Sequence, residues 1–472
     1  MAEIVVIGDI ILDVNYNGTA TRLAQEACVP VVNIIKKEVT SLLGGAANVY
    51  HNLLSVGLDA KLISVGGKDN EYYNFCDILE STRNKFNKKD NLSENCIIID
   101  PSRSTTVKHR FYVNNKMVFR YDSETNEDIS QNTEQMIIEE FNKKIDVCKI
   151  VILSDYNKGV LTPTLTQEII RISNTRKIKV FIDPKLKDVL KYSDCYLIKP
   201  NKNEGEHMCG HKITKDNLEN SMKEIMIKMR CIVCLLTMGE EGIAILSTNE
   251  GFHYFPINQS HVIDITGAGD VVLASFVYNY LRTYNLVCSC LFANYCGQLK
   301  VKNLGTYALT KYDLLVYEST YKNKLIERKD LEDNIELMKG AGKKIVFTNG
   351  CFDILHYGHL TLLEEAKING DILIVALNTD VSIKENKGNE RPINKLEYRI
   401  KQISALSYVD FIVVFEEKTP YEILSIIRPD VLIKGGDYKI ETIVGKNFAK
   451  ETKILKYNDG FSTTGIIEKM KK

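Results

Sequence analysis

The stretch DITGAGD, residues 264–270, decides the first half of the fold, because it joins a turn of small residues to the apolar, helix-forming run at 271–279. Gly267, Ala268 and Gly269 let backbone N–H groups approach an anion closely, and the positive end of the helix dipole favours negative charge there. Asp270 lies at the helix start, where its carboxylate can take a proton from an attacking hydroxyl. A glycine-rich turn with an Asp cap has the same letters, so this motif alone leaves both interpretations open.

Working outward, short apolar runs alternate with helical stretches along almost the whole chain, which predicts an α/β fold with a mostly parallel sheet. Ligands bind such sheets at the carboxyl ends of strands. The expected strands are residues 4–7, 150–153, 180–182, 195–198 and 231–236. The polar or glycine residues near such strand ends or at following helix starts are Asp13, Gly44, Gly45, Asn48, Lys158, Asn201 and Glu204. The sequence has no GxxxxGK[ST] motif, which excludes a P-loop kinase.

Residues 96–122 alternate apolar and polar side chains around Asn114-Asn115, which predicts a β-hairpin on a half-exposed sheet. Together with residues 29–35 it would form a small β-lid beside the main sheet. Lys108, Arg110 and Arg120 on this hairpin, with Lys158, are suited to an anionic substrate such as a sugar phosphate. A solvated strand face explains these cations equally well.

Seven ordered motifs, GD…LD, GGAAN, DYNKG, DPK, PNKNE, TMGEEG and DITGAGD, make residues 1–315 similar to the ribokinase (PfkB) family. The resemblance implies a ribokinase-like fold that transfers the γ-phosphate of ATP to a sugar hydroxyl. It implies Asp270 as the base, the turn Gly267, Ala268 and Gly269 as the anion hole, and Asn201 and Glu204 as contacts to Mg²⁺·ATP. It also implies that the sugar is bound by Asp13, Gly44, Gly45 and Asn48. The hairpin would be the lid over the sugar, and it would build a homodimer.

A second decisive stretch, TNGCFDILHYGH at 348–359, joins an expected strand at 344–348 to a helix at 360–367. Gly358 permits close approach of a phosphate, and His356 and His359 lie on one side of the helix start. Two imidazoles and a helix dipole can stabilise the charge that builds on an α-phosphate during in-line attack. A zinc-binding pair is the alternative, but no suitable third ligand lies nearby in the sequence.

This stretch, with KGNERP, KGGDY and FSTTGII further on, resembles the cytidylyltransferase-like nucleotidyltransferase family over residues 340–472. The resemblance implies a Rossmann-like HxGH domain in which a substrate phosphate attacks the α-phosphate of ATP and pyrophosphate leaves. It implies that His356 and His359 stabilise the transition state and that Mg²⁺ arrives with ATP, without dedicated protein ligands. The nucleotide would be held by Thr348, Asn349, Gly350, Lys387, Arg391, Lys434, Ser462, Thr463 and Thr464.

Apolar periodicity weakens and charge rises over residues 316–328, which indicates a linker. We therefore expect a kinase domain at 1–315, a linker and leading helix at 316–340, and a nucleotidyltransferase domain at 341–472. This pairing resembles the bacterial bifunctional family of heptose 7-phosphate kinases and heptose 1-phosphate adenylyltransferases. It implies formation of heptose 1,7-bisphosphate and of ADP-heptose for lipopolysaccharide core. The alternatives are a kinase–cytidylyltransferase for another sugar or polyol phosphate, and a scaffold with decayed sites.

The composition is that of a soluble globular protein, with 44% hydrophobic and 26% charged residues among 472. Lys+Arg and Asp+Glu are equal at 61 each, so no net field attracts nucleic acid or a membrane. The first residues contain acidic groups and no basic n-region, so we expect a buried strand and a cytoplasmic protein. We expect the cysteine- and histidine-containing segments at 207–211 and 231–234 to hold buried thiols instead of a metal, because strand residues three apart face opposite ways. Residues 69–94 match the family weakly, and we expect a lid helix there.

Overall fold

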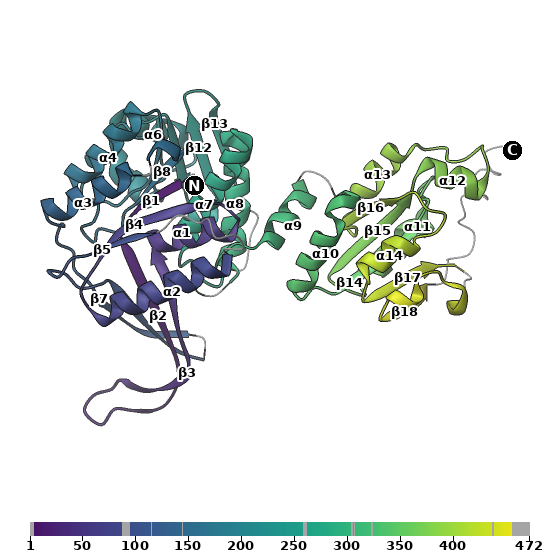
Figure 1. Cartoon of the computed structure of the whole chain (residues 1–472), viewed down its shortest axis with the longest axis horizontal. Coiled ribbons are helices and arrows are strands. Elements are labelled where there is room, and N and C mark those ends of the chain that lie inside the picture. The colour runs from purple at the N-terminus through teal and green to yellow at the C-terminus, as the bar shows by residue number, and fades with distance from the viewer. Residues whose placement is uncertain are drawn as a thin grey trace. The chain divides into compact units, whose positions relative to one another are not determined.

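The computed structural model describes residues 4–86, 95–114, 116–143, 145–257, 262–303, 305, 307–321, 324–436 and 439–455. The chain divides into two compact units, Met1–Thr310 and Lys311–Lys472 (Figure 1). Helix α9 (Lys311–Tyr321) occupies the first part of the segment where the sequence indicated a linker.

The first unit is built on a sheet of nine strands in the order β13-β12-β11-β10-β9-β8-β1-β4-β5. The seven strands from β11 to β5 run parallel, and β12 and β13 pair antiparallel at one edge. Their bounds are β1 (Ile4–Gly8), β4 (Ala60–Gly66), β5 (Cys96–Ile99), β8 (Ile150–Ser154), β9 (Lys179–Asp183), β10 (Leu197–Ile198), β11 (Val233–Thr237), β12 (Ile243–Ser247) and β13 (Gly251–Phe255). The α/β prediction with a mostly parallel sheet is therefore confirmed.

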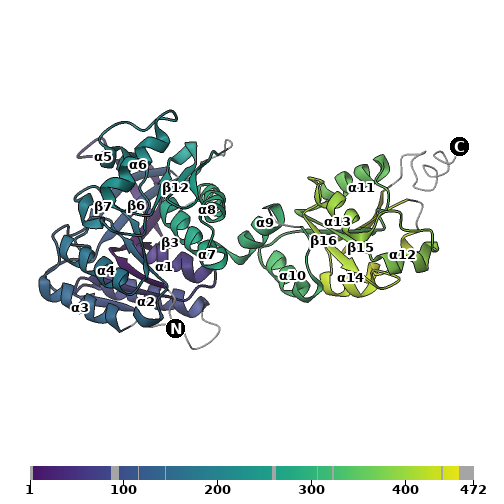
Figure 2. The same cartoon turned by 90° about the horizontal axis from the view of Figure 1, so that it is seen from above.

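Helices cover both faces of this sheet, because consecutive strand residues point to opposite sides. In β1, Val5 and Ile7 pack in the core beneath α3, α4 and α6, whereas Ile4 and Val6 pack beneath α1, α7 and α8. Figure 2 shows α3 and α4 on one side of the unit and α7 and α8 on the other. The helices are α1 (Ala46–Ser55), α2 (Asn70–Phe86), α3 (Gln131–Asn142), α4 (Pro163–Thr175), α5 (Lys202–Cys209), α6 (Leu218–Met229), α7 (Ala268–Thr283) and α8 (Leu286–Val301).

A separate four-stranded sheet, in the order β3-β2-β6-β7, forms the lid. Figure 1 shows β2 (Ile10–Leu23) and β3 (Pro30–Gly45) extending away from the main sheet, and they are joined by β6 (Val107–Val113) and β7 (Lys116–Ser123). The expected hairpin at 96–122 is right for its second part, where β6 and β7 pair antiparallel. It is wrong for residues 96–99, because β5 instead pairs parallel with β4 in the main sheet. Within the segment 69–94, where we expect a lid helix, α2 covers Asn70–Phe86 and contacts both α1 and β3, and residues 87–94 lie outside the described residues.

The second unit contains a five-stranded parallel sheet in the order β16-β15-β14-β17-β18. The strands are β14 (Ile345–Gly350), β15 (Ile372–Asn378), β16 (Phe411–Phe415), β17 (Val431–Gly435) and β18 (Glu451–Leu455). Helices α10 (Leu331–Gly340) and α14 (Tyr421–Ile427) contribute to the core on one face, and α11 (Tyr357–Lys367) and α13 (Leu396–Ser404) to the core on the other. Helix α12 (Asp380–Lys387) follows β15.

The prediction that Cys231 and Cys234 face opposite ways is wrong, since both residues lie in the same core. Strand β11 begins only at Val233, so Cys231 precedes it and does not follow the alternation of a strand. Both residues are buried, and burial raises the pKa of the Cys234 thiol well above its usual range. No cluster of three metal-ligating side chains exists within the described ranges.

None of the helices in the described part of the chain has the length and apolar character needed to cross a membrane.

Candidate active sites

Asp270 lies at the first turn of α7, behind the glycine turn that the sequence singled out. Gly267 precedes the helix with φ of 74°, a conformation that glycine adopts without strain. The Asp270 side chain accepts hydrogen bonds from Asn48 Nδ2 at 2.6 Å and from the Tyr156 hydroxyl at 2.7 Å. Asn48 comes from α1, and Tyr156 follows β8. Two segments that are distant in the sequence therefore donate to one carboxylate on a third.

The Asp270 carboxyl is almost fully buried, at 3% exposure. Burial raises its pKa to about 6, and the neighbouring Asp183 carboxylate adds to this effect. A carboxylate with a raised pKa is a stronger proton acceptor than an exposed one, as a general base requires. The geometry and the charge thus suit Asp270 for deprotonating a hydroxyl.

The raised pKa predicts an acid limb in the pH dependence of the kinase reaction. Asp270 accepts a proton only when ionised, so kcat/KM should fall about tenfold per pH unit below about 6. An ordinary aspartate would give this limb near pH 4. The measurement is the initial rate of ADP formation between pH 4.5 and 8, at limiting sugar phosphate. If kcat/KM stayed unchanged between pH 8 and pH 5, the assignment of Asp270 as the proton acceptor would be contradicted.

Two of the residues predicted to bind the sugar, Arg110 and Gly44, lie directly against Asp13. Arg110 Nη1 on β6 pairs with Asp13 Oδ1 on β2 at 2.6 Å, and both side chains are buried. A Cβ on Gly44 would lie 2.5 Å from Asp13 Oδ2. A Cβ on Gly45, where φ is 60°, would lie 2.3 Å from the Asp9 carbonyl oxygen. A side chain at 44 would therefore push the Asp13 carboxylate aside, and one at 45 would collide with the backbone at Asp9.

Two predicted sugar-binding cations are paired with other acidic or polar side chains, although Arg120 lies close enough to Asp13 for that carboxylate to contribute to the raised pKa of Arg120. Arg120 forms a two-point pair with Asp122 on the exposed strand β7. Lys158 Nζ pairs with Glu124 at 2.8 Å and donates to Asn126 Oδ1 at 2.9 Å. No hydrogen bond or ion pair joins either cation to Asp270 or Asp13 in the described part of the chain. Lys108, in contrast, reaches the site, with Nζ 5.7 Å from the centre of the Tyr156 ring.

Asn201 and Glu204, predicted to contact Mg²⁺·ATP, form a capping box at the start of α5. Asn201 Oδ1 accepts from the Glu204 amide, and Glu204 Oε2 accepts from the Asn201 amide, both at 2.9 Å. Lys185 Nζ donates to the other carboxylate oxygen, Oε1, at 2.8 Å. Because both Glu204 oxygens are engaged, these residues fit a Mg²⁺ that keeps its waters and arrives on ATP phosphates, and not a dedicated cage.

Two polar side chains near Asp270 received no role from the sequence, although Tyr156 stands in the motif DYNKG and Lys199 directly precedes PNKNE. Tyr156 donates to Asp270, and burial raises the pKa of the Tyr156 phenol well above the usual range, which keeps the hydroxyl protonated. Lys199 directly follows β10, and its Nζ lies 2.9 Å from Asp183 Oδ1. Their position directly after strands was the available signal.

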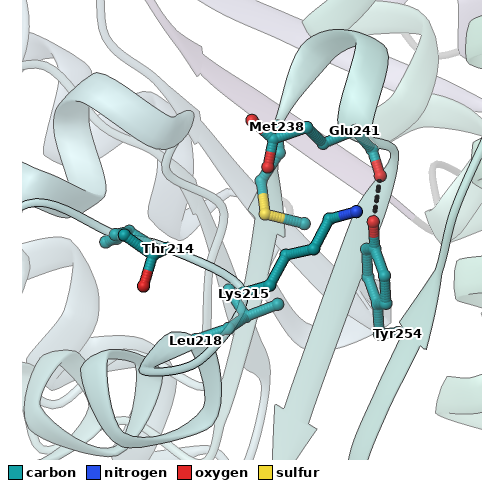
Figure 3. Close-up of a pocket in the computed structure, with 7 residues that line it drawn as sticks. Thr214, Lys215, Leu218, Met238, Glu241 and Tyr254 are labelled. Atoms are coloured by element: carbon teal, nitrogen blue, oxygen red, sulfur yellow. Dashed lines mark hydrogen bonds between the residues drawn. The ribbon is translucent and has the colours of Figure 1, made fainter.

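The TMGEEG motif borders a small depression on the outer side of the same unit. Figure 3 shows it lined by Thr214, Lys215, Leu218, Met238, Glu241 and Tyr254. The Tyr254 hydroxyl donates to the Glu241 carbonyl at 2.7 Å and anchors the turn Gly239–Glu241. None of the predicted site residues lines this depression.

In the second unit, the HxGH histidines stack on each other at the start of α11. The ring centroids of His356 and His359 are 3.8 Å apart with an angle of 23° between the planes. Burial lowers the pKa of both, that of His359 to about 4, with a further contribution from His356. Both rings are therefore neutral at pH 7. His356 Nδ1 and Thr348 Oγ1 are buried without a hydrogen-bond partner among the described residues.

Two predicted nucleotide-binding lysines lie in this unit, Lys434 near the carboxyl end of a parallel strand and Lys387 at the end of a helix. Lys434 on β17 donates to Asn349 Oδ1 at the end of β14. Burial lowers the pKa of Lys434 to about 8, so its ammonium is close to losing its charge. Lys387, at the end of α12, lies close enough to His359 to contribute to the lowering of the histidine's pKa. A Cβ on Gly350 would lie 2.9 Å from the Phe352 ring, so this position requires glycine unless the ring moves.

Arg391 is held by Asp353. This aspartate stands in the stretch TNGCFDILHYGH, but it received no role from the sequence. Arg391 Nε donates to Asp353 Oδ2 at 2.6 Å, and the same carboxylate accepts from the amides of Ile393 and Asn394 at 3.0 and 2.8 Å. Asp353 is 1% exposed. The contact fixes the loop that carries Arg391 beside the histidines' own loop.

Arg399 on α13 was not among the site residues predicted from the sequence. Its fully buried guanidinium donates to the carbonyls of Cys351, Asn378 and Asn394 at 2.9, 2.8 and 3.1 Å, and pairs with Asp380 at 2.7 Å. It ties together the loops after β14 and β15. An arginine in an amphipathic helix reads as exposed, so the sequence contained no distinguishing signal. Ser462, Thr463 and Thr464 lie outside the described residues.

Comparison with known proteins assigns each unit to a protein family. The pfkB family of carbohydrate kinases matches residues 1–311, and the cytidylyltransferase-like family matches residues 347–469. Phosphofructokinase-2 from Escherichia coli shares the fold of the first unit, with a TM-score of 0.55 at 13% identity, over 66% of this chain and 97% of that one. Ribokinase from Giardia lamblia does so with a TM-score of 0.52 at 15% identity, over 66% and 99%. The fold and site thus define a carbohydrate kinase joined to a nucleotidyltransferase.

Relatives that match over nearly the whole chain identify a particular family within this class of kinase–nucleotidyltransferases. The bifunctional protein HldE of Aliarcobacter butzleri is 41% identical over 99% of this chain and 97% of its own length. HldE of Helicobacter pylori is 38% identical over 100% and 99%. The chain belongs to the bifunctional HldE family. The prediction of a heptose kinase and adenylyltransferase of ADP-heptose biosynthesis is confirmed, and the cytidylyltransferase alternative is not favoured.

Proposed function

We propose that the two reactions are carried out by the residues described above. In the first unit, O1 of heptose 7-phosphate attacks the γ-phosphorus of ATP. The O1–P bond forms, the bond to ADP breaks, and the O1 proton passes to Asp270. The observation that carries this assignment is the buried Asp270 carboxylate, oriented by Asn48 and Tyr156, with its pKa raised to about 6.

The turn Gly267–Ala268–Gly269 offers its N–H groups and the helix dipole to the phosphoryl group in transfer. Asp13 and Asn48 take sugar hydroxyls, with Gly44 and Gly45 allowing the sugar close to the backbone. Asn201 and Glu204 are the residues that would hold Mg²⁺·ATP, and a Mg²⁺ there would shield negative charge on the phosphates.

In the second unit, an oxygen of heptose 1-phosphate attacks the α-phosphorus of ATP and pyrophosphate leaves. The neutral imidazoles of His356 and His359 donate N–H groups to the oxygens on which charge builds. Lys387, Arg391 and Lys434 hold the triphosphate, together with the strand end at Thr348, Asn349 and Gly350 and the hydroxyls of Ser462, Thr463 and Thr464. Because both reactions consume ATP, we place the protein in the cytoplasm.

The experiment that tests this function offers the protein each sugar phosphate separately. With ATP and heptose 7-phosphate we expect heptose 1,7-bisphosphate, and with ATP and heptose 1-phosphate we expect ADP-heptose and pyrophosphate. Parallel reactions contain CTP in place of ATP, or fructose 6-phosphate in place of the heptose. Faster pyrophosphate release from CTP, or faster phosphorylation of fructose 6-phosphate, would favour a kinase–cytidylyltransferase for another sugar.

We also propose that two chains pair through the lid sheet. Its strands expose large apolar side chains that water would otherwise surround, namely Ile34, Ile35, Phe119 and Tyr121 at 42, 40, 60 and 53% exposure. We expect light scattering to give twice the chain mass of 53.6 kDa. Replacing Phe119 and Ile34 by Asp should shift the mass to that of the monomer. A monomeric wild type at micromolar concentration would contradict the pairing.

A further inference from the structure

Lys199 is a buried cation next to the anion-binding turn, and the proposed kinase reaction gives it no role. It directly follows β10, and its amide donates to the Ile182 carbonyl at 2.8 Å, which fixes the backbone. The side chain is 3% exposed. Burying a lysine is costly unless a partner offsets the loss of hydration.

The partner is Asp183 at the end of the neighbouring strand β9, with Oδ1 2.9 Å from Lys199 Nζ. An ammonium has three N–H donors. No other hydrogen bond or ion pair joins this ammonium to the residues that the structure describes. The ion pair therefore leaves donor capacity at a position that water hardly reaches.

The turn lies within contact distance of this ammonium. A Cβ placed on Gly269 would lie 3.3 Å from Lys199 Nζ and 3.9 Å from Asp183 Oδ2. The ammonium is also close enough to Asp270 to lower that carboxyl's pKa, whereas Asp183 raises it. Lys199 thus lies between the strand ends and the turn whose N–H groups would bind the phosphoryl group.

We propose that Lys199 is a catalytic residue of the kinase site, whose ammonium donates to the phosphoryl group in transfer from ATP, while Asp183 holds the ammonium against the turn. The inference rests on the proposed kinase reaction. A fixed cation in a site shielded from water stabilises the charge on the equatorial oxygens of the phosphoryl group as the bond to ADP breaks. The proton still passes to Asp270, and Lys199 takes no part in the proton transfer.

The competing explanation is that Lys199 only neutralises Asp183. A charge-neutral double variant separates the two, because Lys199→Met alone leaves a buried carboxylate unpaired and can unfold the unit. In the double variant Lys199→Met/Asp183→Asn, neither charge remains. A matched control is Lys61→Met/Glu140→Gln, which removes another ion pair of a buried lysine, with Lys61 Nζ 2.5 Å from Oε1 of the half-buried Glu140.

The measurement is kcat and KM for bisphosphate formation, with ADP-heptose formation by the same chain as the check on folding. We expect the Lys199→Met/Asp183→Asn variant to lose about 100-fold in kcat, the typical effect of removing one donor to a developing charge, with KM for the sugar within about threefold. Asp183→Asn alone should retain more activity than the double variant. It should also move the acid limb of kcat/KM to lower pH, because the carboxylate that raises the pKa of Asp270 is gone. The Lys61 control should match the wild type.

A Lys199→Met/Asp183→Asn variant whose kcat stays within about threefold of the wild type would overturn the proposal, since the pair would then be only structural. A wild type that makes no bisphosphate would overturn the proposed kinase function itself. The two failures are therefore distinguishable in one set of assays.

Discussion

Replacing Asp270 by Asn should reduce bisphosphate formation about 1,000-fold, within the range known for general bases, and leave ADP-heptose formation unchanged. Asn has nearly the same shape and still accepts the hydrogen bond from Tyr156 at one oxygen, but it cannot take the proton from the sugar hydroxyl. The loss should appear in kcat, because the sugar contacts around Asp13 and Arg110 are untouched.

The measurement is steady-state formation of ADP by the first unit, with pyrophosphate release by the second unit as the internal control for folding. Tyr156→Phe is the matched variant, because it removes the hydroxyl that orients Asp270 and keeps the carboxylate. We expect it to lose less than Asp270→Asn. Equal loss of both activities in Asp270→Asn would mean that the two units do not work as separate sites.

The parts of the kinase site that could be predicted from the sequence are those whose residues lie close together along the chain. The turn Gly267–Gly269 and Asp270 are contiguous, and Gly44, Gly45 and Asn48 share one strand end and helix start. Such segments have their geometry fixed by a few neighbouring dihedral angles, so motif spacing is enough to predict them.

Contacts between distant segments could not be predicted in the same way. Asn48 and Tyr156 meet Asp270 across 222 and 114 residues of chain. Their meeting depends on the order of strands in the sheet, which composition and periodicity do not specify. The same holds for Lys199 and Asp183, which become neighbours only because β9 and β10 are adjacent.

Burial was the second property that sequence patterns failed to reveal. Arg399 and Asp353 are charged residues with 0 and 1% exposure, and charged residues are ordinarily on the surface. Each is buried because it satisfies several backbone groups of the loops around the histidines. The alternation of apolar and polar residues likewise predicts that residues 96–99 belong to the lid. In the structure they form β5, which pairs parallel with β4 in the main sheet.

The histidine pair leads to the largest expected effect in the second unit. Replacing His359 by Ala should reduce ADP-heptose formation about 1,000-fold, the upper range for one donor to a developing oxyanion, and leave bisphosphate formation unchanged. His359 stacks on His356 with centroids 3.8 Å apart, so its loss also removes the surface that orients the second ring. His356→Ala should therefore lose no more than His359→Ala, and the double variant should lose less than the product of the two single effects.

The pH dependence of this reaction distinguishes a neutral from a charged histidine. Burial lowers the pKa of His359 to about 4, so the ring carries no charge above pH 5 in the free protein. If neutral N–H groups do the work, kcat/KM should show no histidine limb between pH 5.5 and 7.5, because the protonation state does not change there. A rate that falls about tenfold per unit as pH rises through 6.5 would show that imidazolium is the active form, since an ordinary histidine titrates there. That result would reverse the electrostatic account while leaving the histidines in place, because the same two rings would then act as buried cations and not as dipoles.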